Sequence, residues 1–218
     1  MPRPKLKPPL RTSSKSNRPK QPALTRKTSF SVRPITAADW PAIEQLFGPN
    51  GACGGCWCMT WRVPRGGKLW EESKGEKNKL AFKRLVKAGK VHGCLAFSEG
   101  VPVGWCCVGP RADFLRLQNI KNLQTNWAAT TWSVTCFFIR NPWRRKGVAT
   151  KLLAEATRVA RAQGATGLEA YPIRPYTDNV PAAFAWTGVP ILFEKLKFVE
   201  ITPPGNSRPI YRKAFRAA

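Results

Sequence analysis

The chain has one histidine, two methionines and no apolar run long enough to cross a membrane. With His92 alone, a usual zinc site built from cysteine and histidine pairs is excluded. The N-terminal segment also lacks the apolar core of a secretory signal, so we expect a cytoplasmic protein with no membrane partner. The seven cysteines are an odd number in a chain without an export signal, which is typical of reduced thiols rather than a disulfide framework.

Acidic residues are also scarce: 12 Asp and Glu stand against 37 Lys and Arg, a formal charge of +25. Residues 1–30 contain six prolines and no acid. This composition predicts a disordered tail over residues 1–29, followed by one folded domain over residues 30–218. The tail is open to three interpretations: a nucleic-acid-binding arm, a passive extension, or a start codon assigned too far upstream.

The folded part keeps a large positive charge, because only part of the basic surplus lies in the tail. Such a surface attracts polyanions through counterion release, so nucleic acid is open as a partner. An enzyme whose cofactor carries several phosphates would have the same charge balance. The charge by itself does not decide between these two classes.

The most informative stretch runs from Val134 to Leu153 and predicts a strand, a basic turn and a helix. The strand, residues 134–139, is apolar on both faces and predicts a central position in a sheet. Its alternation predicts that Val134, Cys136 and Phe138 share one face. The helix begins near Val148 with apolar residues at helical spacing and is expected to end at Gln163 and Gly164.

The turn between them contains three consecutive cations, Arg144, Arg145 and Lys146, followed by Gly147. The first backbone N–H groups of a helix have no partner within the helix and favour a bound anion. Arginine can also bind phosphate through two parallel hydrogen bonds. The turn therefore predicts a phosphate-binding site, and a merely solvated basic connection is the alternative.

This stretch resembles the signature of the GNAT superfamily of N-acetyltransferases, an apolar strand followed by R/Q-x-x-G-x-G/A and a helix. Arg144, Gly147 and Ala149 fill the three motif positions. The resemblance implies an α/β fold in which helices flank a central mixed sheet, and acetyl-CoA as co-substrate. It further implies that the pyrophosphate and the pantetheine arm of coenzyme A contact residues Phe137, Phe138, Ile139, Arg144, Arg145, Lys146, Gly147, Val148, Ala149 and Thr150.

The same resemblance implies direct transfer of an acetyl group to a primary amine. Many members carry a tyrosine, which protonates the leaving thiolate, where this chain has Phe193. Glu169 and Tyr171 are candidates for moving protons, and they share a face of the strand predicted over residues 167–173. For Glu169 the alternative is an ordinary ion pair. Tyr176 is a further candidate for the acid that protonates the leaving thiolate.

A cysteine-rich segment, C-x-x-C-x-C at Cys53, Cys56 and Cys58, follows the first predicted helix. Three thiolates are one ligand short of a structural zinc site, so we expect no metal there. Packing or lining of the acceptor pocket is favoured over metal binding and reactive-thiol chemistry. In GNAT folds this region covers the acceptor site, which implies that the substrate contacts Trp57, Met59, Trp61 and Arg62.

The remaining elements are predicted from periodicity and turn residues. Thr36 and Asp39 predict a capped helix that extends to about residue 47. Strands are expected over residues 30–34, 91–97, 101–108 and 208–215, a helix over residues 68–88, and a helix followed by a strand within residues 182–201. Two alternatives to an acetyltransferase acting on a primary amine of an unidentified acceptor are a family member acting on aminoacyl-tRNA and a non-catalytic coenzyme A-binding module. The acceptor and the oligomeric state are not specified by the sequence.

Overall fold

The computed structural model of this chain describes residues 29–64, 68–175, 181 and 184–215. The predicted tail therefore lies outside the described residues, except for Ser29, and so does Tyr176. In the described part, no helix has both the length and the apolar character needed to span a membrane.

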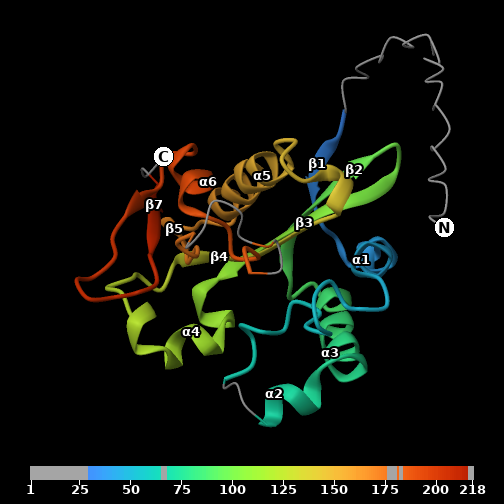
Figure 1. Cartoon of the computed structure of the whole chain (residues 1–218), viewed down its shortest axis with the longest axis horizontal. Helices are drawn as coiled ribbons and strands as arrows, with labels where there is room; N and C mark the ends of the chain where they lie inside the picture. Colours follow the sequence, from blue (N-terminus) through green and yellow to red (C-terminus); the bar gives the residue numbers. More distant parts are fainter. Residues whose placement is uncertain (1–28, 65–67, 176–180, 182–183, 216–218) are drawn as a thin grey trace, which may run out of the picture.

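A seven-stranded sheet forms the centre of the molecule, with strand order β1-β2-β3-β4-β5-β7-β6 (Figure 1). β4 and β5 are parallel, and the other neighbours are antiparallel. The sheet is therefore mixed, as expected. Its strands are β1 Ser31–Pro34, β2 His92–Ser98, β3 Val101–Pro110, β4 Thr131–Ile139, β5 Gly167–Ala170, β6 Val199–Glu200 and β7 Tyr211–Ala214.

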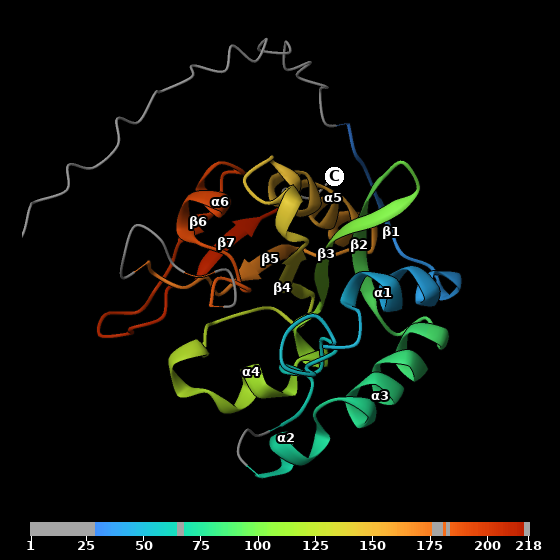
Figure 2. The ribbon, with the colours of Figure 1, turned by 45° about the vertical axis from the view of Figure 1, so that its right-hand side comes forward.

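Helices cover both faces of this sheet (Figure 2). One face packs against α5 (Val148–Ala162) and α6 (Pro190–Glu194). The opposite face packs against α1 (Trp40–Phe47), α3 (Glu76–Lys87) and α4 (Leu115–Asn119). The other helical segments are α2 Lys68–Ser73, η1 Ala37–Asp39, η2 Arg111–Asp113, η3 Lys121–Leu123 and η4 Asn141–Trp143.

The predicted cap of the first helix is confirmed. The Thr36 side chain accepts from the backbone N–H of Ala38, and Asp39 accepts from the backbone N–H of Thr36 at 2.7 Å. Asp39 also accepts two hydrogen bonds from Arg33 of β1, at 2.6 and 2.9 Å. A single carboxylate thus joins the first strand to the start of the first helix.

The helix expected over residues 68–88 is interrupted. α2 ends at Ser73 and α3 begins at Glu76. Gly75 between them has φ +76°, a left-handed conformation that breaks the helical path. Its N–H donates to the carbonyl of Gly55 at 2.9 Å. The break therefore attaches the two helices to the cysteine-rich segment.

A β-bulge in β4 changes which side chains share a face. Cys107 of β3 pairs with Cys136, but Val108 pairs with Val134, so Thr135 is an extra residue. Val134 consequently packs on the α5 side, while Cys136 and Phe138 pack on the α3 side. The prediction that these three residues share one face is wrong, because strict alternation does not hold across a bulge.

The predicted long helix is confirmed as α5, which packs very closely on β3. A Cβ at Gly104 of β3 would lie 2.9 Å from Val148 and 3.2 Å from Leu152. Glycine at this position therefore lets the start of α5 approach the sheet. Gly164, with φ +77°, follows the helix at the expected stop.

β4 and β5 separate toward their own C-terminal ends. Their pairing covers Thr131 to Val134 and Gly167 to Ala170, and β5 ends at Ala170 rather than at residue 173 as expected. Beyond this point, the segment from Ala185 to Val189 lies between the two strands: Phe137 donates to the Trp186 carbonyl, and Ile173 donates to the Gly188 carbonyl. The separation gives one edge of β4 access to a cavity.

Candidate active site

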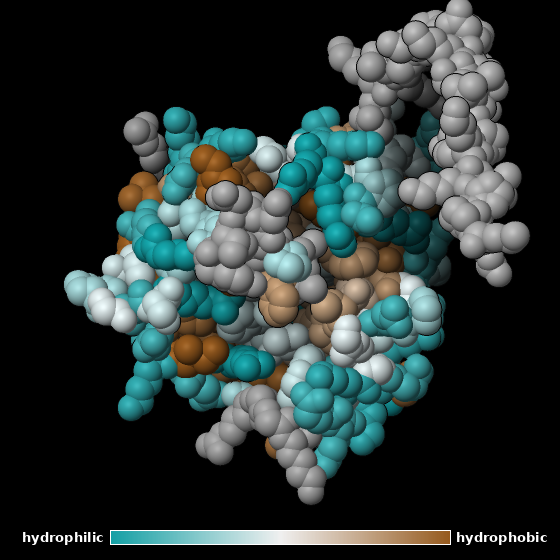
Figure 3. All heavy atoms as spheres, in the orientation of Figure 1, coloured by the Kyte–Doolittle hydropathy of each residue, from teal (hydrophilic) through white to brown (hydrophobic). Residues whose placement is uncertain are grey.

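A cavity of about 650 Å³ lies between the cysteine-rich segment, β4, the start of α5 and the segment before α6. The space-filling view shows a mostly apolar area at the centre of this face, framed by hydrophilic side chains (Figure 3). The described residues that line the cavity are Ala52, Cys53, Gly54, Cys56, Cys58, Thr60, Trp61, Trp70, Lys74, Cys136, Phe137, Phe138, Ile139, Arg144, Ala149, Ala185, Trp186, Gly188, Val189 and Leu192.

The basic turn forms one end of this cavity. Arg144 is exposed, lines the cavity and donates from Nε to the carbonyl of Ile139 at 3.0 Å. Gly147, at the N-cap of α5, has φ +80°, and a Cβ there would meet no atom within 4 Å. Lys151 donates to the Gly147 carbonyl, so the 15-residue helix begins directly behind the turn. Backbone donors, an arginine and open space therefore meet at this end.

Five of the ten predicted cofactor contacts line the cavity: Phe137, Phe138, Ile139, Arg144 and Ala149. The others belong to the same turn and to the first turn of α5. Val148 is buried in the core, so its side chain does not face the cavity. Lys146 is exposed and lies over the ring of Trp143 at 5.5 Å. Arg145 and Thr150 are also outside the lining.

The edge of β4 that faces away from β3 lines the middle of the cavity. The N–H of Phe137 points away from β3 and donates to the carbonyl of Trp186 at 2.6 Å. Strand hydrogen bonds alternate in direction, so Ile139 presents its backbone to the same edge. The carbonyl of Ile139 accepts from Arg144.

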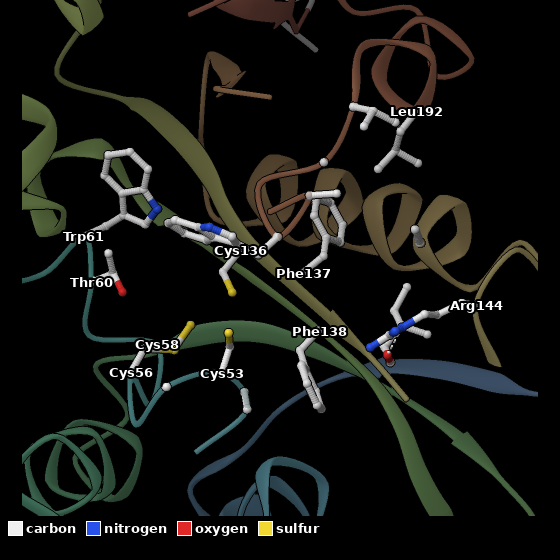
Figure 4. A pocket seen from close by; sticks show the side chains of 18 of the residues that line it. Cys53, Cys56, Cys58, Thr60, Trp61, Cys136, Phe137, Phe138, Arg144 and Leu192 are labelled. Atoms are coloured by element: carbon white, nitrogen blue, oxygen red, sulfur yellow. Dashed lines mark hydrogen bonds between the residues drawn. The ribbon is translucent and has the colours of Figure 1, made fainter. Parts of the chain in front are cut away.

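The cysteine-rich segment and Trp61 form the other end of the cavity (Figure 4). Trp57 and Cys58 have φ values of +43° and +59°, a strained conformation for bulky residues. Trp57 is held there by stacking on Trp40, with ring centroids 5.8 Å apart. This local backbone places Cys56 and Cys58 on the cavity wall.

Four cysteines line this end: Cys53, Cys56 and Cys58, together with Cys136 of β4. The sulfur atoms of Cys53, Cys58 and Cys136 point into the same part of the cavity (Figure 4). All seven cysteines are free thiols. Within the described ranges, no group of three or more possible ligands is arranged to hold a metal ion.

Of the four predicted acceptor contacts, only Trp61 lines the cavity. Its indole N–H donates to the carbonyl of Thr135, the bulge residue, at 3.0 Å. Trp57 and Met59 are buried in the core beneath α1 and α3. Arg62 lies over the ring of Phe114 and 3.7 Å from Asp113, and so is not brought to the cavity.

The predicted proton-transfer residues lie in a buried network outside the cavity lining. Glu169 is fully buried, accepts from Thr125 and is paired with Arg111 at 3.3 Å and with Arg212. The Tyr171 hydroxyl donates to Glu169 at 2.9 Å, so the expected shared face is confirmed. Burial raises the pKa of Tyr171 well above its ordinary value. The geometry is that of the ion pair considered as the alternative for Glu169.

Phe193 and His92 also lie outside the lining. Phe193 is fully buried against Phe137, Phe198 and Tyr211. The His92 ring packs against Trp132 at a tilted angle, and burial lowers the pKa of His92. Neither ring therefore faces the cavity.

Several lining residues had no signal in the sequence. Trp70 and Lys74 reach the cavity because the chain breaks at Gly75, and Trp186 reaches it because β4 and β5 separate. Tryptophan is common in a protein core and lysine on a solvated surface, so neither residue type predicts a cavity wall. Only the tertiary arrangement shows that they line the site.

Comparison with known proteins agrees with this geometry. The acetyltransferase (GNAT) family model matches residues 58–184, more than half of the chain. No curated protein sequence matches significantly.

The fold is similar to that of an N-acetyltransferase from Staphylococcus aureus Mu50, with a TM-score of 0.50, 14% identity, and coverage of 86% of this chain and 99% of that chain. It is also similar to a putative acetyltransferase from Acinetobacter baylyi ADP1, with a TM-score of 0.50, 16% identity, and coverage of 86% and 93%. Identities this low support the fold alone, and the family match carries the assignment. The chain is a member of the GNAT acetyltransferase family, with the mixed sheet and flanking helices of that fold.

Proposed function

We propose that the protein is an N-acetyltransferase that passes the acetyl group of acetyl-CoA directly to a primary amine. The observation that carries the proposal is the cavity, which joins the basic turn at Arg144 to the cysteine-rich end at Cys58 along the edge of β4. The two reactants could therefore meet within one cavity. Proximity of this kind supplies a large part of the rate in transfer reactions.

The co-substrate is acetyl-CoA, as family membership implies. The residues at the turn fit its pyrophosphate: the first N–H groups of α5 have no partner within the helix, Gly147 leaves room, and Arg144 can form a bidentate contact. Arg145, Lys146, Val148, Ala149 and Thr150 complete this proposed phosphate site. When bound, acetyl-CoA supplies an activated acetyl thioester.

The edge of β4 is proposed to orient the arm of the cofactor. Phe137 and Ile139 direct backbone groups toward the cavity, and the Phe138 side chain forms part of its wall. A backbone N–H at this edge would stabilise negative charge on a carbonyl oxygen as the amine attacks. The apolar walls would limit the contact of a bound thioester with water and so slow its hydrolysis.

The test of cofactor binding is thermal unfolding with acetyl-CoA, with ATP as an anion control. Ligand at about 100 times its dissociation constant stabilises a protein by about 2.7 kcal/mol. We expect Arg144→Glu to remove this stabilisation. Arg84→Glu, an equal charge change on the exposed face of α3, should retain it. Undiminished acetyl-CoA affinity in Arg144→Glu, or an equal shift with ATP, would contradict the proposed site.

A coenzyme A-binding module without transfer activity is the second candidate. It is favoured by the hydrogen bond from Phe137 to Trp186, which occupies a backbone donor of β4. It is also favoured by the positions of Glu169, Tyr171 and Phe193 outside the cavity lining. Release of free coenzyme A thiol in the presence of amines, above the rate without amines, would exclude this candidate.

A further inference from the structure

The charges around the cavity limit the kind of amine that fits it. Among the described lining residues, the charged side chains are Lys74 and Arg144, both cationic. Lys74 pairs with Glu71 at 2.7 Å, but Glu71 is exposed and outside the lining. Among the described lining residues, a cationic ammonium group would thus meet positive charge and no carboxylate, which is unfavourable in an apolar surrounding.

The same residues also lack an evident base for an ammonium group. No carboxylate, imidazole or phenol belongs to the described part of the lining. An alkylamine has a pKa near that of lysine, about 10.4, so at neutral pH it is almost entirely protonated and cannot attack a thioester. An amine attached directly to an aromatic ring is neutral under the same conditions, because the ring delocalises its lone pair. Such an acceptor needs no base before it attacks.

The acceptor end is lined by groups that suit an aromatic ring. The rings of Trp61 and Trp186 lie 5.7 Å apart, and both line the cavity with Trp70. The four thiols of this end are small, polarisable and weakly polar. Stacked and edge-on contacts with tryptophan favour an aromatic ligand over an aliphatic one of equal size.

One hydroxyl lies among these apolar groups. Thr60 lines the cavity beside Cys58 and next to Trp61 in the chain (Figure 4). Its oxygen can accept an N–H hydrogen bond without introducing charge. It would act as a positioning residue for the nitrogen of the acceptor.

From these four observations we propose that the acceptor is a weakly basic primary amine carried on an aromatic ring. This inference rests on the proposed acetyltransferase function. The neutral nitrogen forms a bond to the acetyl carbon, and the carbon–sulfur bond of the thioester breaks. The proton lost by the nitrogen ends on the departing sulfur, so the products are an N-aryl acetamide and the free thiol of coenzyme A.

Two isomeric amines separate the effect of basicity from that of size. 4-Methylaniline has its amine on the ring and is neutral at neutral pH, whereas benzylamine is an alkylammonium. With the full chain and saturating acetyl-CoA at about pH 7.5, we expect kcat/KM for 4-methylaniline to exceed that for benzylamine by at least about tenfold, since benzylamine is mostly protonated there. Spermidine, a polycation, should not react. A higher kcat/KM for benzylamine or spermidine would overturn the proposed acceptor class while supporting the acetyltransferase function.

The pH dependence gives a second readout. Between about pH 7 and 9, kcat/KM for benzylamine should rise about tenfold per pH unit, because only its free base attacks, and the value for 4-methylaniline should stay nearly constant. Calorimetric titration of 4-methylaniline in the presence of coenzyme A separates the two proposals. Binding without transfer to any amine would overturn the function and retain the ligand class, and no binding would overturn the ligand class.

Variants at the cavity wall test whether these side chains determine the preference for an aromatic amine. Thr60→Val, which keeps the shape and removes the hydroxyl, should lower kcat/KM for 4-methylaniline and leave the melting temperature near that of the parent. Cys53→Asp adds a carboxylate at an exposed lining position. This change should raise kcat/KM for benzylamine relative to that for 4-methylaniline by about tenfold, because the carboxylate attracts the ammonium form and can then accept its proton. Cys53→Ser is the uncharged control, and an equal gain with serine would show that charge does not determine the selectivity.

Discussion

The backbone N–H of Phe137 donates to the carbonyl oxygen of Trp186 at 2.6 Å, across the gap where β4 and β5 separate. The Trp186 ring in turn lies 5.7 Å from the ring of Trp61 at the far end of the cavity. A ligand arm that needs the Phe137 donor must replace this carbonyl. Cofactor binding and the position of residues 185–189 are therefore coupled in the proposed mechanism.

We expect Trp186→Ala to loosen this contact, because it removes the ring that packs against Trp61. One hydrogen bond contributes about 1 kcal/mol net, so acetyl-CoA affinity should increase by up to about fivefold. The KM of an aromatic amine should rise, since the acceptor wall loses a ring. Calorimetric titration of acetyl-CoA checks the first effect, and a weaker cofactor affinity in the variant would show that Trp186 supports the cofactor rather than competing with it.

Glu169 is expected to stabilise the fold. Glu169→Ala leaves the fully buried Arg111 without its carboxylate partner and should lower the free energy of unfolding by about 3–5 kcal/mol. Urea unfolding measures this loss, and acetyl transfer should fall in proportion to the folded fraction. Glu155→Ala, which removes a partly exposed helical ion pair with Arg158, is the control and should cost under about 1 kcal/mol. A large fall in kcat with unchanged stability of Glu169→Ala would instead restore its role as a base.

Asp39 should make stability depend on pH in the acid range. Hydrogen bonds from Arg33 lower the pKa of Asp39 to about 2 in the folded chain, against an ordinary value of about 3.9. Its contribution is thus fully present above about pH 4 and is lost as the pH falls toward 2. Asp39→Asn should cost about 1–2 kcal/mol at neutral pH, a range reduced because the Arg33 side chain is 48% exposed. Urea unfolding at several pH values should show that this difference disappears near pH 2.

The thiols should react in the order of their exposure. Cys53 is exposed and Cys56 is partly buried, while the other five cysteines are buried. Burial raises the pKa of Cys94 to about 12 and that of Cys106 well above its ordinary value, so both stay protonated and unreactive near pH 8. Iodoacetamide labelling followed by mass spectrometry should modify Cys53 first, and acetyl-CoA should slow this reaction because Cys53 lines the cavity. Rapid modification of Cys94 in the native protein would contradict the burial of that thiol.

The sequence by itself determined the local elements around the turn that we propose as the phosphate site. Residues close together in the sequence encode an apolar strand, a basic turn with Gly147 and an amphipathic helix. Periodicity and backbone chemistry therefore predict β4, the turn and α5. The cap formed by Thr36 and Asp39 is local in the same sense.

The tertiary structure decided the cysteine-rich end of the cavity. The bulge at Thr135 reverses the alternation of β4 and turns Cys136 toward the cysteine-rich segment. The pairing of Glu169 with Arg111 and Arg212 depends on strands and loops far apart in the chain. No periodic pattern encodes such contacts, because they arise from the packing of separate elements and from the entropy of closing long loops.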